Sequence, residues 1–458
     1  MKKFITSLIL IASITPSSVF AYDINTQLSG VPMMESVTPE MNSADYWINK
    51  AENPSEVLMT TEEIEAFNQR NNVYISRLNN FPNTMTADEI KNYIAEAPDF
   101  SEASYYIDGK KLDKSFSDNI NKNIALDNLS TSNKLKFGII TNRTSIRTYP
   151  VSDVVTDASG NLFYDEFQGC EAYYNEPVAI LWESSDKNWY FAIAKAHYGW
   201  IPSKDVALCR TRADFEAAQA YDDFLVVTGD SISLDKNPYD TVTSSMTFSM
   251  GTKLPLAPKD EYGLVVDNRY VKNNFVLKLP VRNDFGYLEY NHALLPVSRD
   301  VSHGYLPYTT ENVLKQSFKM LGNIYGWGGM YNSQDCSGYI KYVYACFGFD
   351  FSRNSASIAS MDLKTTDISQ MTTEEKEAFL DTLTPGSLLY FPGHITIYLG
   401  KDNGKYYTIG SVGSLVPEDS TQLAAVETVT VMINSLDVKR LNGKTWLDNF
   451  TTAVEVLN

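Results

Sequence analysis

The spacing of apolar residues divides this 458-residue chain into segments of different character. From about residue 44 to residue 129 the apolar positions recur at helical spacing, and Thr60 and Thr86 each precede a glutamate by three residues, as in a capping box. Residues 136–209 and 224–297 instead hold short apolar runs separated by turn-forming clusters. Such runs predict the strands of two small barrels that follow a helical region.

From Tyr305 onward the chain combines both patterns. A helix is expected to open at Thr309, and a second helix is expected to begin at Cys336, after a glycine-rich loop. Beyond Pro385 and Gly386, three apolar runs predict antiparallel strands. A helix that carries a cysteine at its start and is followed by such a sheet predicts an α+β fold class.

Composition and charge exclude some classes of partner. Charged residues make up 21% of the chain and hydrophobic ones 43%, which is typical of a soluble globular protein. The net charge is -18, from 56 acidic and 38 basic residues. Nucleic acids and anionic membranes bind clustered lysine and arginine, so we expect neither as a partner, and we expect no stable membrane insertion.

The first residues indicate export. Lys2 and Lys3 precede an apolar run, and Val19-Phe20-Ala21 resembles the end of a cleaved signal peptide. We predict a signal peptide over residues 1–21, a linker over residues 22–43, and a periplasmic or secreted protein. A short membrane anchor is the alternative interpretation of the same apolar run.

The four cysteines do not predict a disulfide scaffold or a metal site. Cys170 and Cys209 bracket one β-rich region and could pair, whereas Cys346 lies in an apolar run typical of a buried thiol. The chain contains no Cys-x-x-Cys or His-x-x-x-His spacing. We therefore expect no metal and no cofactor, and the pairing of Cys170 with Cys209 stays open.

Cys336 and His394 are the candidate nucleophile and base. Unpaired N–H groups at the start of a helix favour a thiolate, and Asp335 and Ser337 flank the cysteine with polar side chains. Alternation along the strand that His394 opens places His394 and Thr396 on one face, which could meet the cysteine helix. A neutral imidazole there would take the thiol proton. A buried, inert cysteine and a surface histidine are the alternatives.

These residues resemble the signature series of NlpC-type, papain-like peptidases of the cell wall. The motifs that carry the resemblance are Gly326-Trp327-Gly328-Gly329, Asp335-Cys336-Ser337-Gly338, Pro385-Gly386-Ser387-Leu388 and Gly393-His394-Ile395. Arg147 to Pro150, Asp165 to Gln168 and Tyr198 to Pro202 are similar to the first SH3-like barrel of multidomain members. The resemblance implies a helical domain over residues 44–130, SH3-like barrels over 134–210 and 222–298, and a papain-like domain over 305–458.

The resemblance also implies an activity. Such members cut the bond between γ-D-glutamate and the diamino acid of a peptidoglycan stem peptide, in fragments with a free N-terminal L-alanine. By the same resemblance Asp335 and Glu166 would hold the α-ammonium of the fragment, and Tyr198 would help to close that end of the groove. Ser337, Trp327 and Ser355 would line the groove.

One position departs from the family pattern. The family has a third polar residue, usually histidine, one strand after the base, where it orients the imidazole. Gly410 stands at that position here, and Thr408 is the nearest substitute.

Two other functions remain open from the sequence. A catalytically decayed protein could bind peptidoglycan fragments in the same groove. An acyl transferase or amidase could use the same framework. The sequence does not distinguish diaminopimelate from lysine in the stem peptide.

Overall fold

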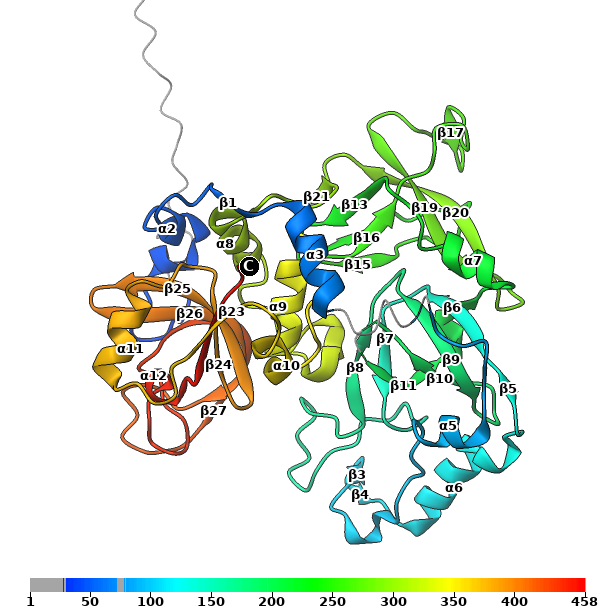
Figure 1. Cartoon of the computed structure of the whole chain (residues 1–458), viewed down its shortest axis with the longest axis horizontal. Helices are drawn as coiled ribbons and strands as arrows, with labels where there is room; N and C mark the ends of the chain where they lie inside the picture. The colour runs from blue at the N-terminus through cyan, green and yellow to red at the C-terminus, as the bar shows by residue number, and fades with distance from the viewer. Residues whose placement is uncertain (1–27, 29, 72–77, 79, 196, 458) are drawn as a thin grey trace, which may run out of the picture.

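The computed structural model describes residues 28, 30–71, 78, 80–195 and 197–457. Figure 1 shows two barrel-like bodies on one side and a sheet flanked by helices on the other, with α3 between them. Helices and strands are segregated in the C-terminal part, so the predicted α+β class is confirmed. The predicted signal peptide, residues 1–21, lies outside the described residues.

The C-terminal domain is built on a six-stranded sheet of order β23-β28-β24-β25-β26-β27. Its strands are β23 (Lys364–Asp367), β24 (Leu388–Phe391), β25 (His394–Asp402), β26 (Lys405–Leu415), β27 (Val426–Ser435) and β28 (Thr452–Glu455). A two-residue turn joins β24 to β25, with Phe391 opposite His394. Gly393 takes a φ of 95° in that turn, which a residue with a side chain rarely adopts.

Short helices surround this sheet. They are α8 (Thr310–Phe318), the 3₁₀ segment η5 (Trp327–Asn332), α9 (Cys336–Ala345), α10 (Ser355–Ala359), α11 (Thr373–Leu380) and α12 (Trp446–Asn449). The Thr309 hydroxyl caps α8 by accepting from the Asn312 N–H at 3.1 Å, as the sequence predicts. Helix α9 packs on the face of the sheet that carries Ile395 and Ile397.

The first barrel is one seven-stranded sheet of order β12-β6-β9-β10-β11-β7-β8. Its strands are β6 (Lys136–Ile140), β7 (Thr144–Arg147), β8 (Gln168–Ala172), β9 (Pro177–Glu183), β10 (Trp189–Ile193), β11 (Tyr198–Pro202) and β12 (Val206–Leu208). The short helix η4 (Ser203–Asp205) precedes β12, and α7 (Arg212–Ala217) follows it. The long segment between β7 and β8 reaches toward the C-terminal domain, where the Tyr331 hydroxyl donates to the Leu162 carbonyl.

The second barrel consists of smaller sheets around its own core. Its strands are β13 (Phe224–Val227), β14 (Ser231–Ser233), β15 (Thr247–Ser249), β16 (Lys253–Pro255), β17 (Val265–Val266), β18 (Arg269–Tyr270), β19 (Asn274–Arg282), β20 (Leu288–Pro296) and β21 (Val301–His303). The long hairpin β19–β20 pairs over nine residues of each strand. Its apolar face closes a core that includes Leu225, Leu277 and Leu295.

The N-terminal helical region is divided between two cores. Its first elements are η1 (Pro39–Asn42), α2 (Ala44–Ile48), β1 (Val57–Met59) and α3 (Thr61–Asn71). Trp47 and Phe67 of this part are fully buried in the core of the C-terminal domain. Strand β1 also pairs with β22 (Tyr308–Thr309), at the start of that domain. Residues 30–71 are therefore structurally part of the C-terminal domain, including much of the segment expected to be a linker.

The remaining N-terminal elements pack on the first barrel. They are β2 (Thr84–Met85), α5 (Ala87–Lys91), η2 (Phe100–Glu102), β3 (Tyr106–Ile107), β4 (Lys110–Lys111), α6 (Lys114–Ile124), η3 (Leu126–Asn128) and β5 (Asn133–Lys134). Ile90 and Ile124 share a core with Phe137 and Trp200 of the barrel. Thr86 caps α5 in the capping box that the sequence predicts.

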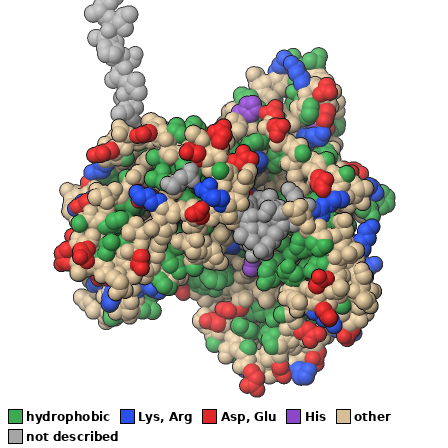
Figure 2. All heavy atoms as spheres, viewed as in Figure 1, with side chains coloured by type: hydrophobic (Ala, Val, Ile, Leu, Met, Phe, Trp, Pro, Cys, Tyr) green, Lys and Arg blue, Asp and Glu red, His purple; other side chains and the backbone are tan. Residues whose placement is uncertain are grey.

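The surface carries charged side chains of both signs, and the cysteines are unpaired. Figure 2 shows acidic and basic side chains interspersed over one face, without a large basic patch in that view. Within the described residues no helix is long and apolar enough to cross a bilayer. Cys170, Cys209, Cys336 and Cys346 are all free thiols, so Cys170 and Cys209 form no disulfide in this structure.

Candidate functional site

The thiol of Cys336 lies at the start of α9, and Asp335 is the N-cap of this helix. The Asp335 carboxylate accepts a hydrogen bond from the Gly338 N–H at 2.8 Å, which satisfies a donor that the first turn leaves open. Farther along the helix, Tyr339 and Val343 are fully buried against the sheet. The helix is thus fixed at its start and along its inner face, and Cys336 stands in the wall of a cavity.

Arg353 binds the same carboxylate from the segment before α10. Its Nη2 donates to Asp335 Oδ2 at 2.7 Å, and its Nη1 donates to Oδ1 at 3.0 Å. The Ser337 hydroxyl donates to Oδ1 at 3.0 Å, and the Gly328 N–H donates to Oδ2 at 3.1 Å. Burial alone would raise the pKa of Asp335, but Arg353 and these hydrogen bonds hold it below its ordinary value. Asp335 is therefore an ionised carboxylate whose oxygens are already engaged.

The surroundings of Cys336 oppose ionisation of its thiol. Burial raises the pKa of the thiol to about 12, and the charge of Asp335 adds to the rise. The Ile395 N–H, the Arg353 guanidinium and the Ser337 N–H act in the opposite direction. The sequence predicts a thiol pKa lowered by the helix start, but burial outweighs that contribution. The resting thiol is protonated at neutral pH.

His394 opens β25 and is held by aromatic rings. The ring centroids of His394 and Trp446 are 4.7 Å apart, and those of His394 and Phe391 are 5.5 Å apart. Burial, with a smaller contribution from the charge of Arg440, lowers the pKa of His394 to about 3. Its Nε2 is buried and has no hydrogen-bond partner among the described residues. The imidazole is therefore neutral at neutral pH.

The faces of β25 differ from the sequence-based interpretation. Ile395 and Ile397 belong to the core that contains α9, whereas Tyr398 belongs to the core on the other side, with Trp446. His394 points to the Trp446 side, at the end of the strand. No hydrogen bond joins the Cys336 thiol to the imidazole, although both residues are described. Gly393, the residue before His394, lines the same cavity as Cys336.

The position of the family's third residue carries no side chain here. A Cβ added at Gly410 would lie 2.8 Å from Thr396 Oγ1, which donates to the Ile409 carbonyl at 2.8 Å. The Thr396 hydroxyl thus fills the space above Gly410. Thr408 lies opposite Tyr398, four residues along β25 from His394, or roughly 13 Å at strand spacing. That placement leaves the Thr408 hydroxyl out of reach of the imidazole.

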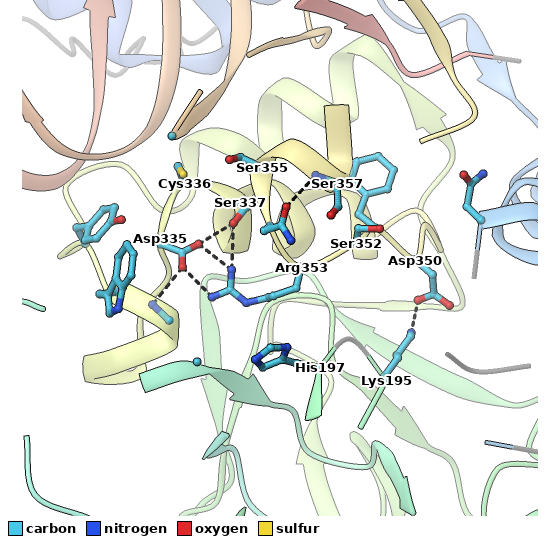
Figure 3. Close-up of a pocket in the computed structure, with 18 residues that line it drawn as sticks. Lys195, His197, Asp335, Cys336, Ser337, Asp350, Ser352, Arg353, Ser355 and Ser357 are labelled. Carbon is cyan, nitrogen blue, oxygen red and sulfur yellow. Dashed lines mark hydrogen bonds and ion pairs between the residues drawn. The ribbon is translucent and has the colours of Figure 1, made fainter. Parts of the chain in front are cut away.

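The cavity beside Cys336 has a volume of about 420 Å³. Figure 3 shows His197 and the Lys195–Asp350 ion pair on the side away from the thiol, with Arg353 between them and Cys336. Of the residues expected to line the groove, four do so: Asp335, Ser337, Trp327 and Ser355. The basic residues of this cavity were not singled out from the sequence, because nothing local marks them.

A second cavity, of about 510 Å³, lies on the other side of Trp327. Glu166 lines it together with Asp157 and Glu427, and no lysine or arginine is among its described lining residues. Burial, followed by the charges of Asp157 and Asp165, raises the pKa of Glu166. Trp327 lines both cavities, so an acidic and a more basic compartment meet at this side chain.

Tyr198 does not line either of these two cavities. Its ring is 40% exposed and contacts Tyr93, at 5.7 Å between centroids, and Phe191, at 6.2 Å. The neighbouring His197 lines the cavity of Cys336 instead. Within the described residues, no group of three or more His, Cys, Asp or Glu side chains could hold a metal ion.

A helix that presents a cysteine to a groove, with a histidine opening a strand of the adjoining antiparallel sheet, is the arrangement found in papain-like cysteine peptidases. Residues 322–454 match the NlpC/P60 family, and residues 156–202 match the SH3 domain of SH3b1 type. The chain is thus similar to the NlpC/P60 family over its C-terminal domain and to SH3 domains of SH3b1 type over part of its first barrel.

Individual relatives are distant. Dipeptidyl-peptidase 6 of Lysinibacillus sphaericus is 27% identical over 131 residues, which cover 28% of this chain and 44% of that protein. The match thus spans less than half the length of this curated relative. The structure of an NlpC/P60 endopeptidase from Photobacterium damselae subsp. piscicida is 18% identical, with a TM-score of 0.71 over 93% of this chain and 99% of that chain. An NlpC/P60 family protein from Bacillus cereus ATCC 10987 has a TM-score of 0.49 at 16% identity, over 70% of this chain and 100% of that chain.

Proposed function

We propose that the protein is an exported cysteine endopeptidase that cuts the γ-D-glutamyl–L-diamino acid bond of peptidoglycan stem peptides. The observation that carries the proposal is the place of Cys336, at a helix start in a cavity next to Trp327, with a carboxylate-rich cavity on the far side of that ring. A stem peptide carries both carboxylates and an ammonium group. Arg353, whose buried Nε has no partner among the described residues, suits the former, and Glu166 suits the latter.

The proposed reaction starts from the neutral Cys336 thiol and the neutral His394 imidazole. As the Cys336 sulfur attacks the γ-glutamyl carbonyl carbon, the thiol proton passes to Nδ1 of His394. The C–N bond then breaks, and the same proton goes to the leaving amine. Water hydrolyses the thioester with His394 as base. The backbone N–H of Cys336 at the helix start is the candidate donor to the oxyanion.

The imidazole has to approach the thiol for this transfer. Catalytic hydrogen bonds are often long in unliganded sites and shorten when substrate binds. Among the described residues the Nε2 of His394 has no hydrogen bond that would have to break first, and the ring is held by its contact with Trp446. Substrate in the groove is proposed to bring the two groups together.

We further propose that the substrate has a free N-terminal L-alanine. Its α-ammonium would bind Glu166, with Asp157 and Glu427 close by in the same cavity. Asp335 is less suited to this role, because Arg353 and three other donors already occupy its oxygens. In this proposal Asp335 positions Cys336 and Arg353 and does not contact the ammonium.

The test is cleavage of L-Ala-γ-D-Glu-diaminopimelate and of the matching lysine peptide, followed by mass spectrometry. The expected product is L-Ala-D-Glu, and Cys336→Ala should abolish it. Glu166→Gln should raise KM for the free peptide and leave KM for its N-acetylated form unchanged. Normal cleavage by Cys336→Ala would sink the catalytic assignment, and equal effects on both peptides would sink the role of Glu166.

A fragment-binding protein is the second candidate. The lack of a side chain at Gly410 and the protonated, buried thiol of Cys336 favour this function, since each is expected to slow catalysis. Peptide binding without cleavage, by the wild-type protein and by Cys336→Ala alike, would identify this function.

A further inference from the structure

A third cavity lies where the two barrels meet the C-terminal domain. Its volume is about 300 Å³, within the range of small-molecule sites. The first barrel contributes Tyr173 to Pro177 and Lys195, the second contributes Met250 to Lys253, and the C-terminal domain contributes Lys341, Tyr342 and the segment Phe349 to Phe351. The cavity is lined by neither Cys336 nor Trp327.

The lining is aromatic and carries an excess of one positive charge. Its charged residues are Lys195, Lys253, Lys341, Glu176 and Asp350. Lys195 forms an ion pair with Asp350. Burial lowers the pKa of Lys341, and the nearby Glu176 counters that effect. Lys253 forms no ion pair with a described residue, although the charges of Asp350 and Asp222 act to raise its pKa.

Lys253 is held by aromatic rings. Its Nζ lies 4.2 Å from the ring centroid of Phe224, 5.0 Å from that of Tyr221 and 5.6 Å from that of Tyr305. Burial, followed by the charge of Lys195, lowers the pKa of Lys253 to about 8. The side chain is partly buried, and no carboxylate of a described residue lies within ion-pair distance of its ammonium.

Two tyrosine hydroxyls belong to the lining of the same cavity. The Tyr221 oxygen accepts a hydrogen bond from Asn175 Nδ2 at 2.9 Å, so its own O–H is free to donate. The Tyr342 hydroxyl is buried and makes no well-formed hydrogen bond to a described residue. Both tyrosines line the cavity. The Lys253 ammonium, these two hydroxyls and several aromatic rings therefore line one cavity.

We infer that this junction cavity is a second ligand site, for a monocarboxylate whose body is an apolar group or a sugar ring. The charged lining residues sum to one positive charge, which one carboxylate balances, whereas a phosphate dianion would leave a negative charge uncompensated. No arginine is among the described lining residues to grip a phosphate at two points. The tyrosine rings supply the faces against which an apolar group or a sugar ring packs.

The junction site borders the cavity of Cys336. Lys195, Asp350 and Phe351 line both cavities. Asp350 lies in the same short segment as Arg353, the partner of Asp335 at the start of α9. A carboxylate bound near Lys253 and Lys195 would compete with Asp350 for the Lys195 ammonium. Because Lys195 and Asp350 also line the cavity of Cys336, a ligand in the junction site would alter the charge at that end of the cavity.

Calorimetric titration of the full-length mature protein in the Cys336→Ala background tests the inference without turnover. The probes are N-acetylmuramic acid, N-acetyl-D-alanine, the neutral sugar N-acetylglucosamine and inorganic phosphate. At least one of the two carboxylates should bind. Binding of N-acetylmuramic acid would indicate a sugar acid, and binding of N-acetyl-D-alanine would indicate the end of a peptide. The neutral sugar and phosphate should bind at least tenfold more weakly.

Lys253→Met should weaken carboxylate binding at least tenfold. Lys272→Met, an exposed position of the same barrel, should leave it unchanged. If Lys253→Met does not fold, Tyr221→Phe supplies a milder change, with an expected loss of about threefold. Carboxylate binding that neither variant weakens, tighter binding of phosphate, or no carboxylate binding would each overturn the inference. None of these outcomes depends on whether the protein cleaves stem peptides.

Discussion

Trp446 contacts His394 with ring centroids 4.7 Å apart and with ring planes tilted by 56°. Trp446 is the first residue of α12, late in the chain, and is 2% exposed. The side chain that lies against the imidazole of His394 is therefore an aromatic ring.

Replacing Trp446 with leucine should lower kcat about 10- to 100-fold with little change in KM, because the imidazole loses the surface that orients it. The matched control is Phe450→Leu. Phe450 lies in the same core and contacts Phe391 and Trp446, but no ring contact joins it to His394. Equal losses of kcat in both variants would show a general packing effect and would contradict a positioning role.

The space around Gly410 predicts how a third catalytic residue could be restored. Gly410→His alone should destabilise the protein by about 1–3 kcal/mol, because its Cβ meets the Thr396 hydroxyl. The double variant Thr396→Gly with Gly410→His removes that hydroxyl and gives His394 Nε2 a candidate partner. We expect kcat to rise above wild type in the double variant only. A double variant that folds and shows no gain would contradict this account.

The rate of alkylation measures the fraction of Cys336 that is ionised. A pKa of about 12 predicts slow reaction of Cys336 with iodoacetamide at pH 7. The rate should rise about tenfold per pH unit, without a plateau up to pH 10. Mass spectrometry of the labelled peptide follows Cys336 alone, and urea-unfolded protein provides the unperturbed thiol for comparison. A plateau below pH 8 would show a thiolate–imidazolium pair instead of the neutral pair.

The lowered pKa of His394 predicts how stability varies with pH. Between about pH 3 and the ordinary value of 6.5, the unfolded chain binds a proton at His394 that the folded protein does not. Stability contributed by this residue therefore rises with pH across that window, by at most about 1.4 kcal/mol per pH unit, and is constant above it. Urea unfolding at pH 4, 5 and 6 should show a smaller slope for His394→Leu than for wild type. His303→Ala, at an exposed position, should keep the wild-type slope.

The Asp335–Arg353 ion pair predicts a large effect on stability. Arg353→Met leaves a buried carboxylate without its counter-ion and should lower the free energy of unfolding by about 3–5 kcal/mol. Adding Asp335→Asn should recover part of that loss. Lys114→Met breaks an exposed pair with Asp118 and should give no measurable change. Thermal and urea unfolding measure all three. A small effect of Arg353→Met would contradict the strength assigned to the buried pair.

The features that the sequence predicted are local ones. The caps at Thr86 and Thr309 and the helix start at Cys336 depend on residues within one turn, and all are present in the structure. The α+β class followed from apolar spacing, which is local as well. The partner of Asp335 is Arg353, and an ion pair between residues that far apart has no periodic signal.

Long-range packing explains what the sequence did not predict. Apolar spacing identifies the buried face of a helix but not the core that covers it, so the division of the N-terminal region between two cores was not foreseeable. The same reason applies to Trp446. An aromatic residue near the end of the chain predicts burial, and only the fold places it on His394. The ionisation of Cys336 also depends on burial by distant segments, which outweighs the local helix start.

The pairing of β1 with β22 has a consequence for biogenesis. Val57 pairs with Thr309, and the core that holds Trp47 and Phe67 also contains Val454, so this N-terminal part completes its structure only with residues made much later. A chain that emerges N-terminus first therefore holds Trp47 and Phe67 without their full core during most of its synthesis. A holding chaperone would protect such a chain from aggregation. A recombinant fragment that begins at the C-terminal domain would lack part of its own interior.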